Sequence, residues 1–336
     1  MILKTCIETL MRGENLNPIA CEQALTALLD PSINPLQIAA FLVLLRAKSE
    51  TAEELSTIVT TLRNKMTVVP INHRVLDIVG TGGDGLNTVN ISTGSALLAA
   101  SCGVKVAKHG NRSVSSLTGS ADVLEALGVN ITLTSEQISK SIDQIGIGFC
   151  YSPHFHPLTQ ALRPLRKQLN VATTFNMIGP LLNPARAGHI ILGVSDEKLL
   201  SILADVLMQT GSIRSMVVHG TGLDEISCAG PVKIIEVSQQ EKRAYILDPE
   251  SLGLPRCDVA DLRGGDANTN AQLLLNAFKG HDGPIANTLI FNAAVALYLY
   301  GVYPSIHHAI AHARDNLASG AVLTLLNKWT EFSHDQ

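Results

Sequence analysis

Charged and aromatic side chains are scarce in this sequence. Only 16 % of the 336 residues are Asp, Glu, Lys or Arg, and only 4 % are Phe, Trp or Tyr, against 46 % hydrophobic residues. Ala, Leu, Ile and Val must therefore fill the interior, as they do where helices pack on a buried parallel sheet. The formal net charge of −4 argues against a general nucleic-acid-binding protein, which is normally basic, so any anion site must be local.

Paired cysteines and long apolar runs are also missing. The six cysteines are scattered without a CxxC pair, which is typical of a reduced intracellular protein and not of a disulfide scaffold or zinc site. The N-terminal segment lacks the apolar core of a signal peptide, and no run of about 18 apolar residues predicts a membrane span. We therefore expect a soluble, cytoplasmic protein without membrane contact.

A helical beginning is followed by alternating strands and helices. Cap signals at Asn17 and Thr51 predict short helices, because these side chains accept hydrogen bonds from the free N–H groups of a first helical turn. We expect a small N-terminal helical domain over residues 1–70, joined by a helical segment around 160–187. The larger α/β domain, residues 71–336, should have a central, mostly parallel sheet flanked by helices.

Apolar runs and breaker residues place the individual elements of the larger domain. Strands are expected at 75–79, 104–107, 147–151, 189–194 and 215–219, with a hairpin at 232–237 and 243–247. Helices are expected at 96–102, 120–127, 135–145, 197–209, 268–279, 284–300 and 304–327, and a Pro/Gly/Asn-rich connection at 173–188.

Two loops rich in glycine and hydroxyl residues follow the first two expected strands. One runs from Gly80 to Gly85, and the other from Lys108 to Ser116. Glycine lets the backbone come close to a ligand, and a loop that leads into a helix offers unpaired N–H groups and the positive end of the helix dipole to an anion. Because such loops meet at the carboxyl edge of a parallel sheet, they favour a site for a phosphorylated small molecule.

A tight turn without function is the alternative interpretation of the first loop. Its sequence fits neither the GxGxxG pattern of dinucleotide sites nor the GxxxxGK[ST] loop of NTPases. Two such loops in succession, the second with Lys108 and Arg112, favour the functional interpretation, because these cations supply charge-assisted hydrogen bonds.

A third loop carries two neighbouring acids, Asp224 and Glu225, directly after the expected strand at 215–219. Carboxylate oxygens are ligands that Mg²⁺ shares readily with substrate phosphates. A solvated acidic turn is the alternative, but the apolar surroundings and the two phosphate-type loops favour a metal site.

Six segments carry a family resemblance: GTGGD (80–84), NTVNIST (87–93), KHGNRSVSS (108–116), GSADVLEALG (119–128), FNMIGPLLNP (175–184) and LDE (223–225). Together they closely resemble the anthranilate phosphoribosyltransferases, which belong to the nucleoside phosphorylase-like phosphoribosyltransferases, over essentially the whole chain. The resemblance implies a step of tryptophan biosynthesis. In it the amine of anthranilate displaces pyrophosphate from C1 of 5-phosphoribosyl 1-pyrophosphate (PRPP), giving N-(5-phosphoribosyl)anthranilate.

The resemblance also implies a role for individual residues. Mg²⁺, two ions per subunit, is expected to be held by Ser92, Asp224 and Glu225. The residues expected to bind PRPP are Gly80, Gly83, Asp84, Thr88, Asn90, Ile91, Ser92, Thr93, Lys108, His109, Gly110, Asn111, Arg112, Ser113, Val114, Ser115, Ser116 and Ser120.

Anthranilate is a flat aromatic acid whose carboxylate suits an arginine fork. The resemblance implies that Arg166 supplies this fork and that Gly80 and Asn111 also contact anthranilate. A solvated helix face, shared with Arg163 and Lys167, is the alternative for Arg166. No general base is assigned, because the amine loses its proton readily once the new bond forms, so positioning should dominate.

Two segments depart from the usual family pattern. Asn170 and Ala172 stand where family members usually have Gly and Arg, and Ala286 and Asn287 stand where they usually have two charged residues. The first departure lies close to Arg166. It is expected to influence how tightly anthranilate is bound and which ring-substituted acids are accepted. The second is expected to change only a local salt bridge.

Two other functions compete with this interpretation. A pyrimidine nucleoside phosphorylase shares the architecture but needs no magnesium pair, so Asp224 and Glu225 argue against it. A non-catalytic relative that binds nucleotide or nucleic acid is disfavoured by the intact Asn111, Arg166 and acidic pair and by the negative net charge. The resemblance and the apolar N-terminal helices predict a homodimer. The expected binding partners are the two small substrates, PRPP and anthranilate.

Overall fold

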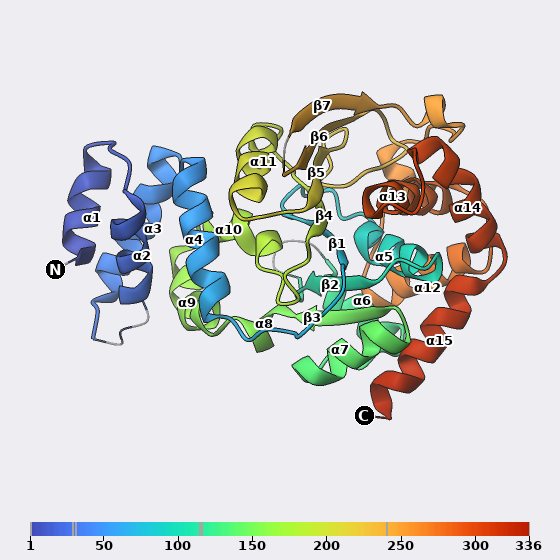
Figure 1. Cartoon of the computed structure of the whole chain (residues 1–336), viewed down its shortest axis with the longest axis horizontal. Helices are drawn as coiled ribbons and strands as arrows, with labels where there is room; N and C mark the ends of the chain where they lie inside the picture. The colour runs from blue at the N-terminus through green and yellow to red at the C-terminus, as the bar shows by residue number, and fades with distance from the viewer. Residues whose placement is uncertain (1, 29, 31, 114–116, 240, 336) are drawn as a thin grey trace.

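The N-terminal helices form one end of an elongated molecule, and a central sheet lies between them and the C-terminal helices (Figure 1). The computed structural model describes residues 2–28, 30, 32–113, 117–239 and 241–335. The first four helices are α1 (Ile2–Met11), α2 (Pro18–Ala27), α3 (Pro35–Lys48) and α4 (Ala52–Lys65). They pack as a bundle in which α1 contacts α2 and α3, and α2 contacts α4.

The expected caps begin three of these helices. The Asn17 side chain accepts from the N–H of Ala20 before α2, and Asn34 caps α3 in the same way. Thr51 and Glu54 form a reciprocal capping box at the start of α4. Because each cap satisfies donors that a helix leaves free in its first turn, these polar residues determine where the helices begin.

Within the described residues, seven strands form one sheet in the order β3-β2-β1-β4-β5-β6-β7. The strands are β1 (Leu76–Gly80), β2 (Val106–Gly110), β3 (Ile147–Tyr151), β4 (His189–Gly193), β5 (Arg214–His219), β6 (Val232–Ser238) and β7 (Lys242–Leu247). The first five run parallel, and β6 and β7 are added antiparallel. The register pairs Gly80 with Gly193, so the two strand-ending glycines lie side by side.

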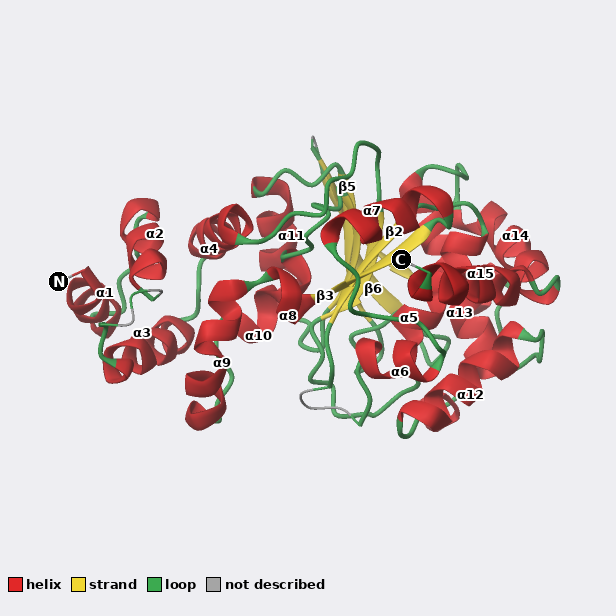
Figure 2. Ribbon diagram, turned by 90° about the horizontal axis from the view of Figure 1, so that it is seen from below, coloured by secondary structure: helices red, strands yellow, loops and turns green. Residues whose placement is uncertain are grey.

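Helices cover both faces of the sheet (Figure 2). Side chains alternate between these faces along a strand. In β4, Ile191 belongs to the core with α5 (Ile91–Ser101) and α13 (Pro284–Tyr300), whereas Ile190 and Leu192 belong to the core that continues into the N-terminal helices. The second core is therefore continuous from the sheet into the helical end of the molecule.

The remaining helical elements complete the two layers and the connections. They are α6 (Ser120–Ala126), α7 (Ser135–Gln144), α8 (Ser152–Phe155), α9 (Pro157–Leu169), α10 (Phe175–Ile178), η1 (Gly179–Leu181), α11 (Leu199–Gln209), η2 (Glu250–Leu252), η3 (Val259–Leu262), α12 (Ala267–Phe278), α14 (Ile306–Ala318) and α15 (Ala321–His334). Of these, α9 packs against α3 and α4, and α11 packs against α4.

The predicted fold class, a small helical domain and a larger α/β domain with a mostly parallel sheet, is confirmed. Several element predictions were wrong; the helix expected at 96–102, for example, begins at Ile91 as α5. β2 includes Lys108, His109 and Gly110, which the sequence placed in a loop. The last predicted helix, 304–327, is two helices that separate at Gly320, whose φ of +75° is left-handed. The connection at 173–188 contains the short helices α10 and η1.

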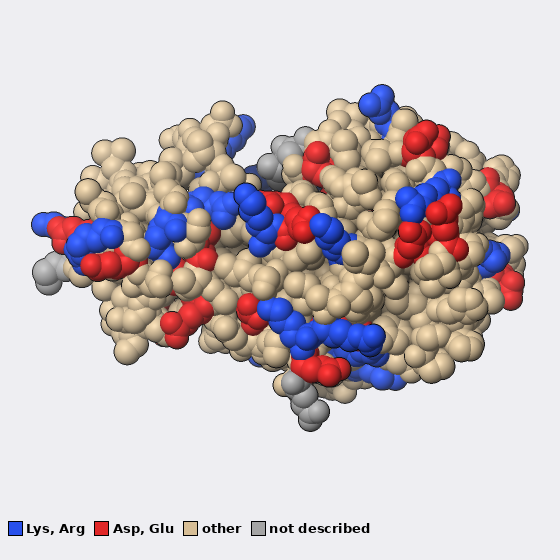
Figure 3. Space-filling view, turned by 90° about the horizontal axis from the view of Figure 1, so that it is seen from above, with Lys and Arg blue, Asp and Glu red and all other residues tan. Residues whose placement is uncertain are grey.

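Charge is distributed without a dominant sign over the face drawn in Figure 3, where basic and acidic side chains are interspersed. All six cysteines are free thiols. Among the described residues, no helix combines the length and apolar character needed to cross a membrane.

Candidate active site

The glycine-rich loop after β1 and the acidic loop after β5 meet at the carboxyl edge of the sheet. The N–H of Gly82 donates to the Asp224 carboxylate, with 2.6 Å between N and Oδ2. A side chain on Gly80 would collide with this carboxylate, and one on Gly193 would collide with the Asp224 backbone. Glycine at the ends of β1 and β4 therefore allows Asp224 to lie directly over them, at the point where the strand order reverses and ligands usually bind.

Three carboxylates gather in this loop cluster. Asp224 is only 7 % exposed. Burial, and then the neighbouring Asp84, raise its pKa above the usual range. Burial, and then Asp224, raise the pKa of Glu225 in the same way, while Lys108 opposes the shift. A divalent cation would relieve this crowding of like charges, so these oxygen donors fit Mg²⁺. No group of three His, Cys, Asp or Glu in the described part of the chain is placed as a complete metal site.

Lys108 connects the strand ends to the start of α5. Its ammonium donates to the carbonyl oxygen of Ile78 at 2.8 Å and to the Ser92 hydroxyl at 3.3 Å, and the side chain is fully enclosed. The Ser92 N–H, in the first turn of α5, donates to Glu225 Oε1 at 3.4 Å. Ser92, Lys108 and Glu225 therefore form one polar group at the positive end of a helix, where anions are stabilised.

The segment between the first loop and α5 is held by a distant residue. Asn90 donates to the carbonyl oxygen of Thr118, and its Oδ1 accepts from Asn270 of α12 at 2.9 Å. Thr88 forms a backbone bridge with Arg263. Thr93, which follows in α5, is buried and its hydroxyl has no hydrogen-bond partner in the structure. No sequence signal indicated that Asn270 would take part, because it lies in an ordinary helix far along the chain.

The second phosphate-type loop closes against the start of α6. The Asp122 carboxylate accepts from the N–H groups of Ser113 and Gly119 at 3.0 and 2.9 Å, and the Ser120 hydroxyl donates to the carbonyl oxygen of Asn111. Arg112 forms ion pairs with Asp122 and Glu125, so its guanidinium faces α6. Val114, Ser115 and Ser116, which were also expected to bind PRPP, lie outside the described residues.

Buried polar residues of β1 and β2 lie next to this loop. Asp77, in β1, accepts from the His109 N–H at 3.1 Å and from the Asn183 side chain at 2.7 Å. The His109 ring meets the His156 ring, with 3.2 Å between their Nε2 atoms. Burial, followed by His156, lowers the pKa of His109 well below its usual value, and burial lowers that of His156 to about 4. Both rings are therefore neutral near pH 7. The sequence interpretation missed the roles of Asp77 and Asn183.

Arg166 lies on α9, which packs against α3 and α4 in the helical end of the molecule. Its guanidinium stacks over the Phe175 ring at 5.3 Å and donates to Asn176 Oδ1 at 3.4 Å. Its Nε is buried without a partner, and burial lowers its pKa. It forms no ion pair with any carboxylate in the part of the chain that the structure describes, so this cation is available to an acid.

The departure at Asn170 is explained by backbone geometry. Asn170 ends α9 in the left-handed conformation, with φ +50°. Asn tolerates this conformation better than most residues other than Gly, so the helix ends as it would with glycine. The other departure places Ala286 and Asn287 in the buried first turn of α13.

Comparison with known proteins decides the family. A model of the glycosyl transferase family, a/b domain, matches residues 72–323, and a model of the helical bundle domain of the same family matches residues 4–66. Anthranilate phosphoribosyltransferase of Chlamydia felis is 43 % identical over 333 residues, which cover 99 % of this chain and 97 % of the relative. The chain belongs to the anthranilate phosphoribosyltransferase family.

Solved structures of the family have the same fold. The crystal structure of anthranilate phosphoribosyltransferase from Thermus thermophilus has a TM-score of 0.91 and 38 % identity, and the match covers 98 % of this chain and 99 % of that chain. The enzyme of Saccharomyces cerevisiae in complex with PRPP and Mg has a TM-score of 0.90 and 26 % identity, covering 99 % and 98 %. The family expected from the sequence is thus confirmed over the full chain.

Proposed function

We propose that this chain transfers the 5-phosphoribosyl group of PRPP to the amine of anthranilate, with release of pyrophosphate, in tryptophan biosynthesis. The observation that carries the proposal is the meeting of Asp224 and Glu225 with the glycine loop and the start of α5. Family membership supports it, and so does the complex of the yeast relative with PRPP and Mg. No observation favours a pyrimidine nucleoside phosphorylase or a non-catalytic binding protein.

PRPP would lie along the carboxyl edge of β1, β4 and β2. We assign three sets of groups to its phosphates and ribose. They are the N–H groups of Gly83 and Asp84, the first turn of α5 with Ile91, and the side chains of Thr88, Asn90 and Ser92. Lys108, Gly110 and the loop from Asn111 to Ser120 would complete the cradle. Backbone N–H groups and hydroxyls suit this role because they donate hydrogen bonds to phosphate oxygens.

Asp224 and Glu225, with Ser92, would hold Mg²⁺, and we assign two ions to each subunit. When bound, magnesium supplies positive charge that stabilises a departing pyrophosphate. The raised pKa values of both acids support the assignment, because a cation offsets their mutual repulsion. Lys108, which donates to the Ser92 hydroxyl at 3.3 Å, adds a hydrogen-bond donor from the protein itself; burial lowers its pKa, and Asp77 and Glu225 oppose that shift.

Arg166 would bind the anthranilate carboxylate, with Asn111 and Gly80 nearer to C1 of the ribose. This arrangement holds the amine against the carbon that it attacks, which lowers the entropic part of the barrier. The buried His109 and His156 rings are neutral, and neither is needed as a base because the amine proton becomes acidic once the C–N bond forms. Positioning and charge neutralisation therefore account for the reaction.

The direct test is the loss of anthranilate fluorescence on addition of PRPP and Mg²⁺. We expect turnover that requires both PRPP and Mg²⁺ and stops on chelation. Asp224→Asn should lower kcat by roughly 100-fold or more, while the remaining amide oxygen still accepts from Gly82 and preserves the loop. Phosphate-dependent cleavage of a pyrimidine nucleoside without anthranilate turnover would contradict the proposal.

Arg166→Ala tests the acceptor site separately. We expect the KM for anthranilate to rise by roughly 10- to 100-fold, the equivalent of a lost charge-assisted hydrogen bond, with little change in the KM for PRPP. Arg163→Ala, on the exposed face of the same helix, is the matched control. Equal effects of Arg166→Ala on both substrates would place the acceptor elsewhere.

Three further assignments belong to this proposal. We divide the chain at about residue 70, with α9 and α10 belonging to the helical domain because α9 packs on α3 and α4.

We assign a homodimer formed through the N-terminal helices, which expose Met11, Ile19 and Leu36; sedimentation at micromolar concentration tests it. Six free thiols support a location in the reducing cytoplasm.

A further inference from the structure

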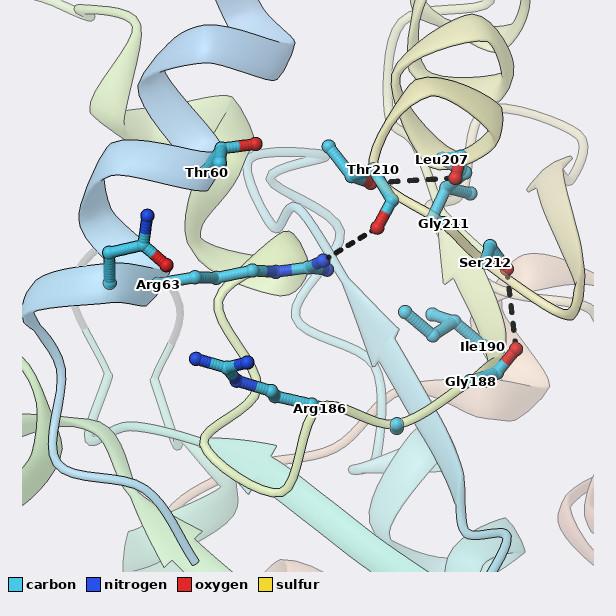
Figure 4. A pocket seen from close by; sticks show the side chains of 11 residues that line it. Thr60, Arg63, Arg186, Gly188, Ile190, Leu207, Thr210, Gly211 and Ser212 are labelled. Atoms are coloured by element: carbon cyan, nitrogen blue, oxygen red, sulfur yellow. Dashed lines mark hydrogen bonds between the residues drawn. The ribbon is translucent and has the colours of Figure 1, made fainter. Parts of the chain in front are cut away.

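A polar cavity of about 300 Å³ lies at the opposite edge of the sheet from the candidate active site. It opens between α4, the segment that leads into β4, and the turn between α11 and β5 (Figure 4). Since β4 and β5 are parallel and begin here, none of the loops assigned to PRPP reaches it. The cavity joins the helical end of the molecule to the α/β part.

Arg63 extends from α4 across this cavity. Its Nε donates to the carbonyl oxygen of Leu181 at 2.8 Å, and its Nη1 donates to that of Thr210 at 3.2 Å. Burial, and then the neighbouring Arg186, lower its pKa to about 10. The guanidinium is therefore fixed by two neutral carbonyl groups, and no carboxylate among the described residues forms an ion pair with it.

Arg186 approaches Arg63 from the segment before β4, and Figure 4 shows its side chain extending into the space beside Arg63. Its backbone has φ +50°, a left-handed conformation that is uncommon for residues other than Gly, Asn and Asp. The exposed side chain forms no hydrogen bond or ion pair with any described residue. A bound ligand would explain why a left-handed backbone carries an unpaired cation into a cavity.

The rest of the lining is neutral. Thr60, Asn64, Thr210 and Ser212 add hydroxyl and amide groups, and no Asp or Glu lines the cavity within the described part of the chain. Two guanidinium groups without a counter-charge repel each other, and a multiply charged anion between them would convert this repulsion into two charge-assisted contacts. Guanidinium groups bind phosphate oxygens through paired N–H donors.

We propose that this cavity binds a phosphate- or pyrophosphate-type oxyanion, held between Arg63 and Arg186 with a hydroxyl donor from Thr60. Such an anion would bridge α4 and the segment before β4, and so fasten the helical domain to the sheet. The site does not depend on the proposed reaction, because none of its residues touches the PRPP or anthranilate sites.

Thermal unfolding in magnesium-free buffer tests the proposal, with inorganic phosphate and pyrophosphate titrated separately to about 10 mM. A ligand that binds only the folded state raises the Tm according to its affinity. Phosphate bound at the candidate active site contributes equally to every variant, so only differences between variants count. We compare wild type with Arg186→Gly and Arg186→Asn, which both tolerate φ +50°, and with the control Arg243→Ala, an exposed arginine on β7.

The anion-induced rise in Tm should be the same in wild type and Arg243→Ala and should fall by at least half in both Arg186 variants. If the Arg186 variants lose more of the Tm rise caused by phosphate, the ligand carries a monophosphate group. If they lose more of the rise caused by pyrophosphate, it carries a diphosphate group. Arg63→Lys, which keeps the charge but loses the planar fork, should also weaken the effect. Equal rises in all variants with both anions would overturn the proposal, whatever the anthranilate assay shows.

Discussion

Gly80 is one of two strand-ending glycines, with Gly193, on which the contact between the two candidate substrate loops depends. Its φ is not left-handed, so alanine is compatible with the backbone, and the obstacle is the Asp224 carboxylate, which an added Cβ would meet. Gly80→Ala should displace this carboxylate and lower kcat/KM by roughly 100-fold, the usual cost of a displacement of about 1 Å at a reacting centre. The steady-state assay measures this.

The folded state of the Gly80→Ala variant should remain intact, since the collision is confined to the loop cluster at the carboxyl edge of the sheet. Circular dichroism and thermal unfolding should therefore resemble wild type within a few degrees. Wild-type turnover in this variant would show that Asp224 need not lie over β1, and would remove the basis for its assignment to magnesium.

His189 controls part of the acid stability, away from the candidate site. Burial, followed by Arg74 and Arg214, lowers its pKa to about 4, so the folded state keeps it neutral. In the unfolded chain it takes up a proton near pH 6.5. The free energy of unfolding is therefore unaffected by this ring above pH 6.5. It falls by at most about 3 kcal/mol on account of this ring as the pH is lowered toward 4.

His189→Leu should accordingly flatten the fall in unfolding free energy between pH 6.5 and 4, measured by urea titration at several pH values. The exposed His281→Gln is the control and should leave the slope unchanged. His109 and His156, which are also buried and neutral, will keep part of the slope. An unaltered pH dependence in His189→Leu would show that this ring is protonated in the folded protein.

At the scale of elements, α6 holds the second loop closed through one carboxylate. Asp122 accepts from the N–H groups of Ser113 and Gly119, which bracket the segment that the structure does not describe. Asp122→Ala removes both bonds and should raise the KM for PRPP by at least roughly 10-fold, because each bond to a charged group contributes about 1.5–3 kcal/mol and a 10-fold change corresponds to about 1.4 kcal/mol. Steady-state kinetics with varied PRPP measures the change.

Glu125→Ala is the matched control for this loop. It removes the other partner of Arg112 but leaves the backbone donors paired, and an exposed ion pair contributes at most about 1 kcal/mol. We expect a nearly normal KM for PRPP. If both variants behaved alike, the ion pair of Arg112 and not the closure of the loop would determine PRPP binding.

Local patterns predicted most elements, because caps, glycines and apolar periodicity act over a few residues. β3 and α13 were predicted with their observed bounds. The break between α14 and α15 was missed because helical periodicity continues through Ser319 and Gly320, and only the left-handed glycine ends the first helix. The extension of β2 was missed because Lys108 and His109 are polar, and their burial depends on partners from other strands.

The candidate site was predictable only where its residues lie in recognisable motifs. The loops at 80–84 and 224–225 are such motifs, and the structure places them in contact. The alternative of a solvated acidic turn does not fit Asp224, because this residue is buried against β1 and β4. Asn270 was unpredictable, because it is separated from its partner Asn90 by 180 residues and only the packing of the whole molecule brings them together.

At the scale of the whole molecule, Glu50 links the helical domain to the segment that supports Arg166. It lies just after α3, and one carboxylate oxygen accepts from the Thr174 hydroxyl while the other pairs with Arg46 at 3.1 Å. Thr174 directly precedes Phe175, the ring on which Arg166 stacks. The position of the proposed acceptor arginine therefore depends on how α3 meets α10.

Glu50→Ala should raise the KM for anthranilate several-fold more than the KM for PRPP, because it releases the acceptor segment and leaves the phosphate loops untouched. It should also lower the unfolding free energy by about 2–4 kcal/mol, since it leaves a buried hydroxyl and a half-buried guanidinium unpaired. Steady-state kinetics and urea unfolding measure the two effects. Glu53→Ala, an exposed acid in the first turn of α4, is the control. A KM for anthranilate unchanged by Glu50→Ala would mean that α9 alone positions Arg166.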